Sequence, residues 1–223
     1  MLFAAGRGTR MGALTRTRPK PLVKVAGRAL LDHALAQVDA AGADRIVVNT
    51  HYLADQIRDH LRDRPAIRLS HEETLLETGG GLRAALPLLG ADPVVTLNTD
   101  AVWTCANPIA QLRAAWDPTR MEALLLLIDP TRAHGHAGTG DFLIDPQGRL
   151  TRGPGLIYSG VQITRTEGLH QIDESVFSMN VLWNRMLREG RLFGLIHDGS
   201  WGDVGHPEGI ATAEALLREA RDV

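Results

Sequence analysis

Small and cationic residues near the start of the chain are arranged in a way that suits phosphate binding. Gly6 and Gly8 open a loop directly after the apolar run 1–5, and Arg10 and Lys20 follow within it. Glycines let the main chain approach a ligand, and successive free N–H groups can hold an anion. Arg10 adds a permanent cation whose planar fork suits phosphate, and Lys20 adds a more flexible one. The pattern predicts a phosphate-binding loop.

Two widespread phosphate motifs do not describe this loop. The string G-x-x-x-x-G-K-[ST] does not occur, and a G-x-G-x-x-G fingerprint that begins at Gly6 and Gly8 has Met11 in place of its third glycine. The glycines alone are equally compatible with a basic surface loop.

Two aspartates stand where a ligand site could form. Asp100 follows the apolar run 93–97, which predicts a buried strand, and open α/β sheets bind ligands at the carboxyl ends of their strands. Asp203 lies between Gly202 and Gly205, so the chain around it can approach a ligand closely. Taken singly, each aspartate could also be an ordinary turn residue.

The elements that would position these groups alternate between strand and helix in the first half of the chain. This alternation predicts a mostly parallel sheet with helices on both faces, and antiparallel strands in the second half make the sheet mixed. We expect one α/β domain over residues 1–223, with a first strand that either lacks a few leading residues or is stunted. The expected strands are 1–5, 46–48, 67–69, 93–97, 123–128, 141–144 and 156–163, and the expected helices are 31–42, 53–61, 82–86, 108–115, 179–189 and 207–220.

Composition excludes several classes of partner. The chain has 24 Lys+Arg and 26 Asp+Glu, and a formal net charge of −2 gives no footprint for a nucleic acid. The longest apolar run, 123–128, is far shorter than a membrane span, and the chain does not open with a secretory signal. The single cysteine, Cys105, fits a reducing cytoplasmic location and predicts a packing role, because no base is paired with it. The oligomeric state is left open.

The motif A-A-G-x-G-T-R-M followed by T-R-P-K-P-L-V-x-V-A-G, at 4–11 and 17–27, resembles the signature loop of the sugar nucleotidyltransferases. The resemblance implies a single Rossmann-like domain that binds a nucleoside triphosphate and a sugar 1-phosphate, uses Mg²⁺ and releases pyrophosphate. W-x-D-[VI]-G at 201–205 and L-x-T-G-G at 76–80 resemble further motifs of that family. Glycines at a helix start would let a flat base lie against the main chain, although a flexible hinge is the alternative.

The resemblance assigns roles residue by residue. Arg10 would contact the β- and γ-phosphates and Lys20 the reacting phosphate, while Asp100 and Asp203 would hold Mg²⁺. Arg10, Lys20 and Asp100 are thus the expected catalytic residues. The expected nucleotide-binding residues are Ala5, Gly6, Gly8, Thr9, Arg10, Lys20, Thr74, Glu77 and Gly80.

Shorter motifs resemble the N-acetylmuramate 1-phosphate uridylyltransferases within that family. They are N-T-H-Y at 49–52, G-D-F at 140–142 and Y-S-G-V at 158–161. This resemblance implies UTP as donor, N-acetylmuramate 1-phosphate as acceptor, a role in peptidoglycan recycling, and sugar contacts from Asn98 and Asp141. Thr99 departs from the Gly or Ser that is more common in the wider nucleotidyltransferase family, and it would crowd the pocket. Segment 177–180 lacks the basic residue that the N-acetylmuramate enzymes tend to carry near the sugar phosphate.

Other functions stay open at this stage. Glucose 1-phosphate or another sugar 1-phosphate is an alternative acceptor. A metal-dependent glycosyltransferase would not need the Arg10 and Lys20 loop, which handles pyrophosphate. A non-catalytic regulator that binds nucleotide would be expected to lack one of Arg10, Lys20, Asp100 and Asp203, all of which are present. His134 and His136 are interpreted as solvated loop histidines.

Overall fold

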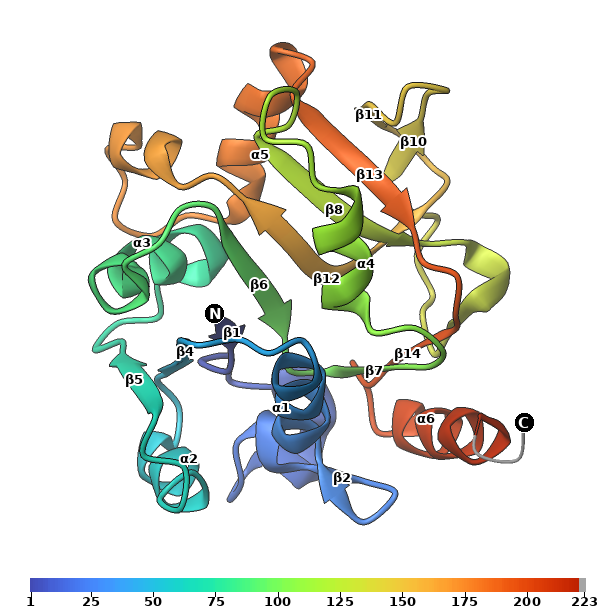
Figure 1. Ribbon diagram of the computed structural model, residues 1–223. Helices are drawn as coiled ribbons and strands as arrows, with labels where there is room; N and C mark the ends of the chain where they lie inside the picture. Colours follow the sequence, from blue (N-terminus) through green and yellow to red (C-terminus); the bar gives the residue numbers. More distant parts are fainter. Residues whose placement is uncertain (221–223) are drawn as a thin grey trace.

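A seven-stranded sheet forms the centre of the computed structural model, which describes residues 1–220 (Figure 1). The strand order is β13-β8-β12-β6-β1-β4-β5, and only β12 runs antiparallel to its two neighbours. The mostly parallel mixed sheet expected from the sequence is confirmed. Its strands are β1 (Leu2–Phe3), β4 (Ile46–Thr50), β5 (Ile67–His71), β6 (Val94–Asn98), β8 (Ala123–Ile128), β12 (Ile157–Thr164) and β13 (Leu192–Ile196).

Helices cover both faces of this sheet, and α4 lies in front of β8 in Figure 1 while α5 lies behind it. Helices α1, α2 and α4 share one apolar core with the sheet, and α3 and α5 share the other. The α-helices are α1 (Leu30–Ala40), α2 (Ala54–His60), α3 (Glu77–Leu89), α4 (Pro108–Ala115), α5 (Met179–Arg188) and α6 (Glu208–Glu219). Short 3₁₀ helices are η1 (Thr9–Thr15), η2 (Lys20–Leu22), η3 (Pro130–Arg132) and η4 (Glu167–Gln171).

Strand β8 shows how an uninterrupted apolar run serves two cores at once. Leu124 and Leu126 pack on the side of α4, whereas Leu125 and Leu127 pack on the side of α5. Successive side chains of a strand point to opposite faces, so a strand buried on both sides needs apolar residues throughout.

Helix α3 is longer than the sequence predicts, because tertiary contacts override the poor helix propensity of its glycines. The predicted segment was 82–86, but the helix runs through three glycines and Pro87. The N–H groups of Gly79 and Gly80 donate to the carbonyl of Phe177 at 2.9 and 3.0 Å. Leu82 and Ala85 are buried on the same helix.

Three small sheets complete the fold, and most of their strands are not predicted from the sequence. They contain β7 (Ala101–Trp103), β14 (Trp201–Asp203) and β9 (Ala133–His134); β10 (Phe142–Ile144) and β11 (Leu150–Arg152); and β2 (Lys24–Val25) and β3 (Arg28–Ala29). Helix α6 buries Ala213 and Leu216 against the rest of the domain.

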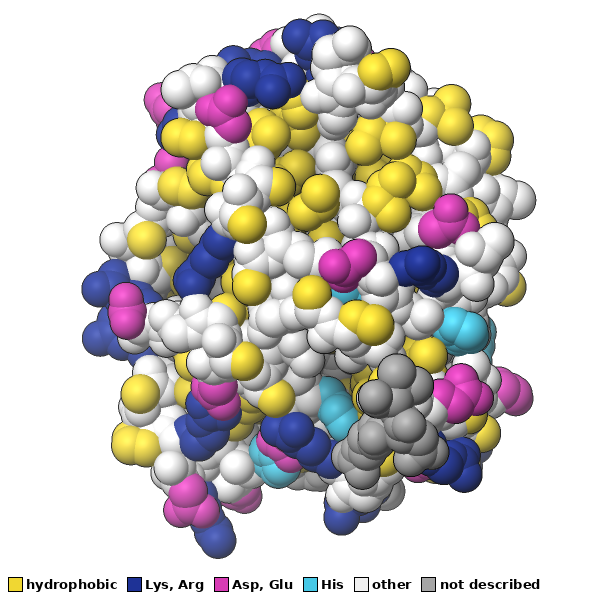
Figure 2. Space-filling view, turned by 45° about the vertical axis from the view of Figure 1, so that its right-hand side comes forward, with side chains coloured by type: hydrophobic (Ala, Val, Ile, Leu, Met, Phe, Trp, Pro, Cys, Tyr) yellow, Lys and Arg dark blue, Asp and Glu magenta, His cyan; other side chains and the backbone are white. Residues whose placement is uncertain are grey.

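The surface carries charges of both signs. On the face shown in Figure 2, Lys and Arg side chains are interspersed with Asp and Glu, and hydrophobic side chains gather in the upper half. Among the described helices, none combines the length and the apolar character that crossing a membrane requires.

Candidate active site

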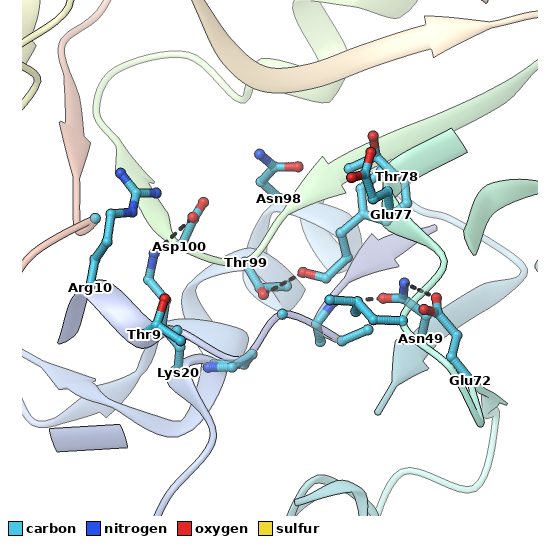
Figure 3. A pocket seen from close by; sticks show the side chains of 18 of the residues that line it. Thr9, Arg10, Lys20, Asn49, Glu72, Glu77, Thr78, Asn98, Thr99 and Asp100 are labelled. Atoms are coloured by element: carbon cyan, nitrogen blue, oxygen red, sulfur yellow. Dashed lines mark hydrogen bonds and ion pairs between the residues drawn. The ribbon is translucent and has the colours of Figure 1, made fainter. Parts of the chain in front are cut away.

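A cavity of about 450 Å³ opens at the carboxyl ends of β1, β4 and β6. Cavities of this size accommodate small-molecule ligands. Figure 3 shows that the two ends of the cavity carry different groups. Arg10, Lys20 and Asp100 lie at one end, and Asn49 and Glu72 lie at the other. The lining residues are Phe3, Ala4, Ala5, Gly6, Gly8, Thr9, Arg10, Lys20, Pro21, Asn49, Glu72, Leu75, Glu77, Thr78, Asn98, Thr99, Asp100, Ser178 and Gly205.

The glycine-rich loop folds over the cationic end of the cavity. Gly8 has a φ of 63°, and a side chain there would place its Cβ only 2.8 Å from the Cβ of Lys20. Gly8 is therefore required for both backbone conformation and space. Its carbonyl accepts hydrogen bonds from the Thr15 hydroxyl and the Met11 N–H, each at 2.9 Å, which fixes η1 behind the loop.

Lys20 forms an ion pair with Asp100 across the cavity. Its Nζ lies 2.8 Å from Oδ2 of Asp100, and the two side chains are 11% and 34% exposed. Lys20 comes from η2 and Asp100 follows β6, so the pair joins the basic loop to the central sheet. A phosphate group that enters the cavity could therefore pair with the Lys20 ammonium in place of the Asp100 carboxylate.

Pairing between β7 and β14 brings the second carboxylate to the first. Asp203 pairs with Ala101, and the N–H of Val204 donates to the carbonyl of Asp100 at 2.9 Å. Burial first, and then the charge of Asp100, raises the pKa of Asp203; Lys20 and other cations oppose this shift. The two carboxylates thus repel one another, and a positive charge placed close to both would stabilise their ionised forms.

These two carboxylates fit the donor set of Mg²⁺. Within residues 1–220 no group of three or more His, Cys, Asp or Glu residues could hold a metal ion. Mg²⁺ is usually bound through one or two carboxylates, with phosphate oxygens and water completing its shell. The chain therefore offers the protein share of such a site, at Asp100 and Asp203, and leaves the remaining positions to a phosphate-bearing ligand.

A buried polar network that sequence analysis missed forms the opposite end of the cavity. Asn49 accepts from the Ala4 N–H at 2.7 Å and donates to Oε1 of Glu72 at 2.7 Å. The other oxygen of Glu72 accepts from the Leu76 N–H at 2.9 Å, and Glu72 is only 2% exposed. The network fixes the end of β1 against the loop before α3. Its signal in the sequence is an amide within the apolar strand 46–50.

The expected nucleotide-binding residues fall into two groups. Most of them line the cavity, but Thr74 is exposed on the loop before α3 and neither it nor Gly80 is a lining residue. A side chain at Gly80 would meet the Ser175 carbonyl at 2.5 Å, and one at Gly79 would meet the Phe177 ring at 2.4 Å. These glycines give room to the chain's own segment 175–177.

The expected sugar contacts are also separated. Asn98 lines the cavity, and Gly160 faces it so closely that a Cβ would lie 2.8 Å from the Asn98 side chain. Asp141 is exposed, is not a lining residue, and accepts from the Tyr158 N–H at 2.8 Å. Thr99 is buried and donates to the Phe3 carbonyl at 2.7 Å, so its hydroxyl ties β6 to β1.

Two expectations about isolated residues are wrong. Cys105 is exposed and has a φ of 62°, so it does not pack in the core. His136 is not a freely solvated loop residue, because its Nδ1 lies 3.8 Å from Oδ2 of Asp203 and its ring lies 5.9 Å from that of Trp201. His134 belongs to β9 and pairs with Gly202.

Comparison with known proteins agrees with this geometry. Residues 1–171 match the family model described as a MobA-like NTP transferase domain. An N-acetylmuramate alpha-1-phosphate uridylyltransferase of Caulobacter vibrioides is 42% identical, covering 99% of this chain and 97% of the relative. A protein of the same name from Neisseria meningitidis serogroup B is 37% identical, with 97% and 96% covered.

The fold has solved counterparts as well. The crystal structure of HddC from Yersinia pseudotuberculosis complexed with GMP-PN superimposes with a TM-score of 0.77 at 21% identity, covering 97% of both chains. The full-length similarity to the curated relatives and the match over residues 1–171 lead to one conclusion: this chain belongs to the MobA-like NTP transferase family.

Proposed function

We propose that this chain transfers UMP from UTP to N-acetylmuramate 1-phosphate and releases pyrophosphate. The observation that carries the proposal is the cavity lined by Arg10, Lys20 and Asp100. Asp203 does not line this cavity, but it pairs with Ala101 beside Asp100, and the charge of Asp100 acts on it. Further support comes from the two uridylyltransferases of the same family, which match almost the whole chain at 42% and 37% identity.

The reaction makes one bond and breaks one. An oxygen of the sugar 1-phosphate attacks the α-phosphorus of UTP, and the bond from that phosphorus to the β-phosphate bridging oxygen breaks. Pyrophosphate leaves with the electron pair. The attacking oxygen is already anionic, so no general base is needed, and the main barrier is the approach of two polyanions.

The chain's own residues lower that barrier by position and charge. Arg10 neutralises the departing pyrophosphate, and Lys20 moves its ammonium from Asp100 toward the reacting phosphate. Asp100 and Asp203 would hold Mg²⁺, which supplies positive charge between the two substrates when bound. Asn98, which lines the cavity, and Asp141, which lies outside its lining, are assigned to the sugar. The end of the cavity with Asn49 and Glu72 is assigned to the nucleoside.

A substrate panel tests the proposal directly. UTP, dTTP, CTP, GTP and ATP would each be incubated with N-acetylmuramate 1-phosphate, N-acetylglucosamine 1-phosphate or glucose 1-phosphate in the presence of Mg²⁺, and pyrophosphate would be measured. We expect the fastest release from UTP with N-acetylmuramate 1-phosphate. Faster turnover of glucose 1-phosphate would contradict the acceptor, and release from no pair would contradict the reaction.

We also propose a cytoplasmic role in peptidoglycan recycling. N-Acetylmuramate is a peptidoglycan sugar, and the exposed free thiol of Cys105 is compatible with a reducing compartment. A strain without this chain is expected to accumulate N-acetylmuramate 1-phosphate. Unchanged levels of that metabolite would contradict this role.

A further inference from the structure

A chain of hydrogen bonds connects Arg152 to the cavity. Arg152 ends β11, and its Nη2 donates to Oδ1 of Asn180 at 2.5 Å and to Oδ1 of Asn184 at 3.2 Å. Asn180 in turn donates to the Ser178 hydroxyl at 3.0 Å, and Ser178 lines the cavity at the start of α5. Arg152 therefore supplies a cation beside segment 177–180, which has no basic residue of its own.

The guanidinium of Arg152 is held in place by aromatic rings. Its central carbon lies 4.6 Å from the ring centre of Phe142 and 5.8 Å from that of Trp183. Partial burial lowers the pKa of Arg152, and the charge of Asp141 opposes this shift. A planar cation that is fixed by packing loses little conformational freedom when it binds an anion.

Arg152 also retains unused binding capacity. None of the described residues accepts a hydrogen bond from its Nε or Nη1, and no described carboxylate forms an ion pair with it. Asp141, the carboxylate whose charge acts on Arg152, already accepts from the Tyr158 N–H. A positioned guanidinium with free donors is suited to a carboxylate or phosphate group on a ligand.

Arg152 does not line the cavity itself and is separate from the cations that do. The triphosphate has Arg10 and Lys20 at the glycine-rich loop. Arg152 instead lies beside Asp141, one of the two residues assigned to the sugar, and joins the cavity through Ser178. An anionic substituent on the sugar ring, rather than the triphosphate, is the group that this cation would meet.

We propose that Arg152 is a specificity-determining residue that binds a carboxylate on the acceptor sugar. The inference rests on the proposed function, and it explains how the site would select N-acetylmuramate 1-phosphate. That sugar differs from N-acetylglucosamine 1-phosphate by a lactyl ether, which carries a carboxylate. The selection then comes from one ion pair, because the remaining groups of the two sugars are alike.

The test compares the two acceptors in Arg152→Gln, Arg152→Lys and the control Arg149→Gln, which removes a cation from the same hairpin. Arg152→Gln is expected to lower kcat/KM for N-acetylmuramate 1-phosphate about 10- to 100-fold, the range for one charge-assisted hydrogen bond. The value for N-acetylglucosamine 1-phosphate and the KM for UTP should not change. Arg152→Lys should recover part of the loss, and Arg149→Gln should behave as wild type. Equal losses for both acceptors, or no loss, would overturn the inference.

A binding measurement separates this inference from the proposed reaction. Calorimetric titration of the wild-type protein with each sugar 1-phosphate needs no turnover. We expect tighter binding of N-acetylmuramate 1-phosphate in wild type and equal binding of the two sugars in Arg152→Gln. Equal binding in wild type overturns the role of Arg152. Preferential binding that Arg152→Gln abolishes, without pyrophosphate release, leaves that role intact and rejects the reaction instead.

Discussion

Lys20 and Asp100 lie 80 positions apart in the chain, yet Nζ of Lys20 and Oδ2 of Asp100 are 2.8 Å apart. This ion pair places the most buried cation of the basic loop beside a carboxylate that is also expected to hold Mg²⁺. When a substrate binds, Lys20 and Asp100 can therefore each give up the other as partner and pair with a charged group of the substrate or with the metal ion. Most of the expected chemistry depends on that exchange.

Lys20→Ala and Arg10→Ala are each expected to lower kcat/KM by about 10² or more, because each removes charge stabilisation from the transition state. Lys24→Ala is the matched control, since Lys24 is an exposed lysine of β2 outside the cavity. Pyrophosphate release and thermal unfolding would be measured on all three variants. Turnover close to wild type in either of the first two would reject its assigned role.

The stability of the metal-free protein is expected to depend on the ionisation of Asp203. Its folded-state pKa is raised by burial and by the charge of Asp100. Ionisation thus carries a penalty in the folded state that is absent below the unfolded pKa of about 3.9, grows as the pH rises toward the raised value, and is complete above it. Asp203→Asn should therefore raise Tm at neutral pH, and the gain should vanish in acid.

This prediction is checked by thermal unfolding in EDTA from about pH 3.5 to 8. Asp63→Asn serves as the control, because the Asp63 side chain is 90% exposed. The same Tm difference between wild type and Asp203→Asn at every pH would show that this carboxyl is not destabilised by ionisation. Loss of activity in Asp203→Asn is expected in either case.

Alanine is expected to lower stability at one glycine and activity at another. Gly80→Ala places a Cβ 2.5 Å from the Ser175 carbonyl and should destabilise the fold by about 1–3 kcal/mol. Gly6→Ala meets no atom within 4 Å, so its stability should stay near wild type while kcat/KM falls, because the added methyl group enters the cavity. Denaturant unfolding and kinetics on both variants check this contrast. A stable Gly80→Ala would contradict the packing argument.

Glu72→Gln is expected to raise KM for the triphosphate about tenfold with little change in kcat. The carboxylate accepts from both Asn49 and Leu76, whereas an amide turns one acceptor into a donor and loses one of these bonds. Glu73→Gln is the control, because Glu73 is exposed on the same loop. A fall in kcat with an unchanged KM would place Glu72 in the chemistry and not in nucleotide binding.

Local signals were enough to predict several elements to the residue. The apolar run 123–128 is β8, and the helix expected at 108–115 is α4, which Asn107 caps by accepting from the Ile109 and Ala110 N–H groups. In both cases the residues that define the element lie within it or directly beside it in the sequence. The basic loop was predictable for the same reason, because its glycines and cations lie within 15 positions of one another (20 − 6 + 1).

Features that depend on distant partners were not predictable. β7 and β14 have three residues each, too few to show a period, and they are strands because they pair across about a hundred positions. Helix α3 continues through its glycines because the carbonyl of Phe177 accepts their N–H groups. The position of Arg152 is of the same kind, since Asn180 and Trp183 come from α5. Residues of this kind can be read from the sequence, but their contacts with distant segments cannot.

The junction between α3 and α5 has a consequence for how the two substrates affect each other. The Met179 N–H donates to the Thr78 hydroxyl at 3.0 Å, and Thr78 and Ser178 both line the cavity. A shift of Thr78 on binding of the triphosphate would therefore reach the start of α5, where the acceptor is expected. Such coupling is reciprocal, so the factor by which UTP changes the affinity for the sugar 1-phosphate equals the factor by which the sugar changes the affinity for UTP.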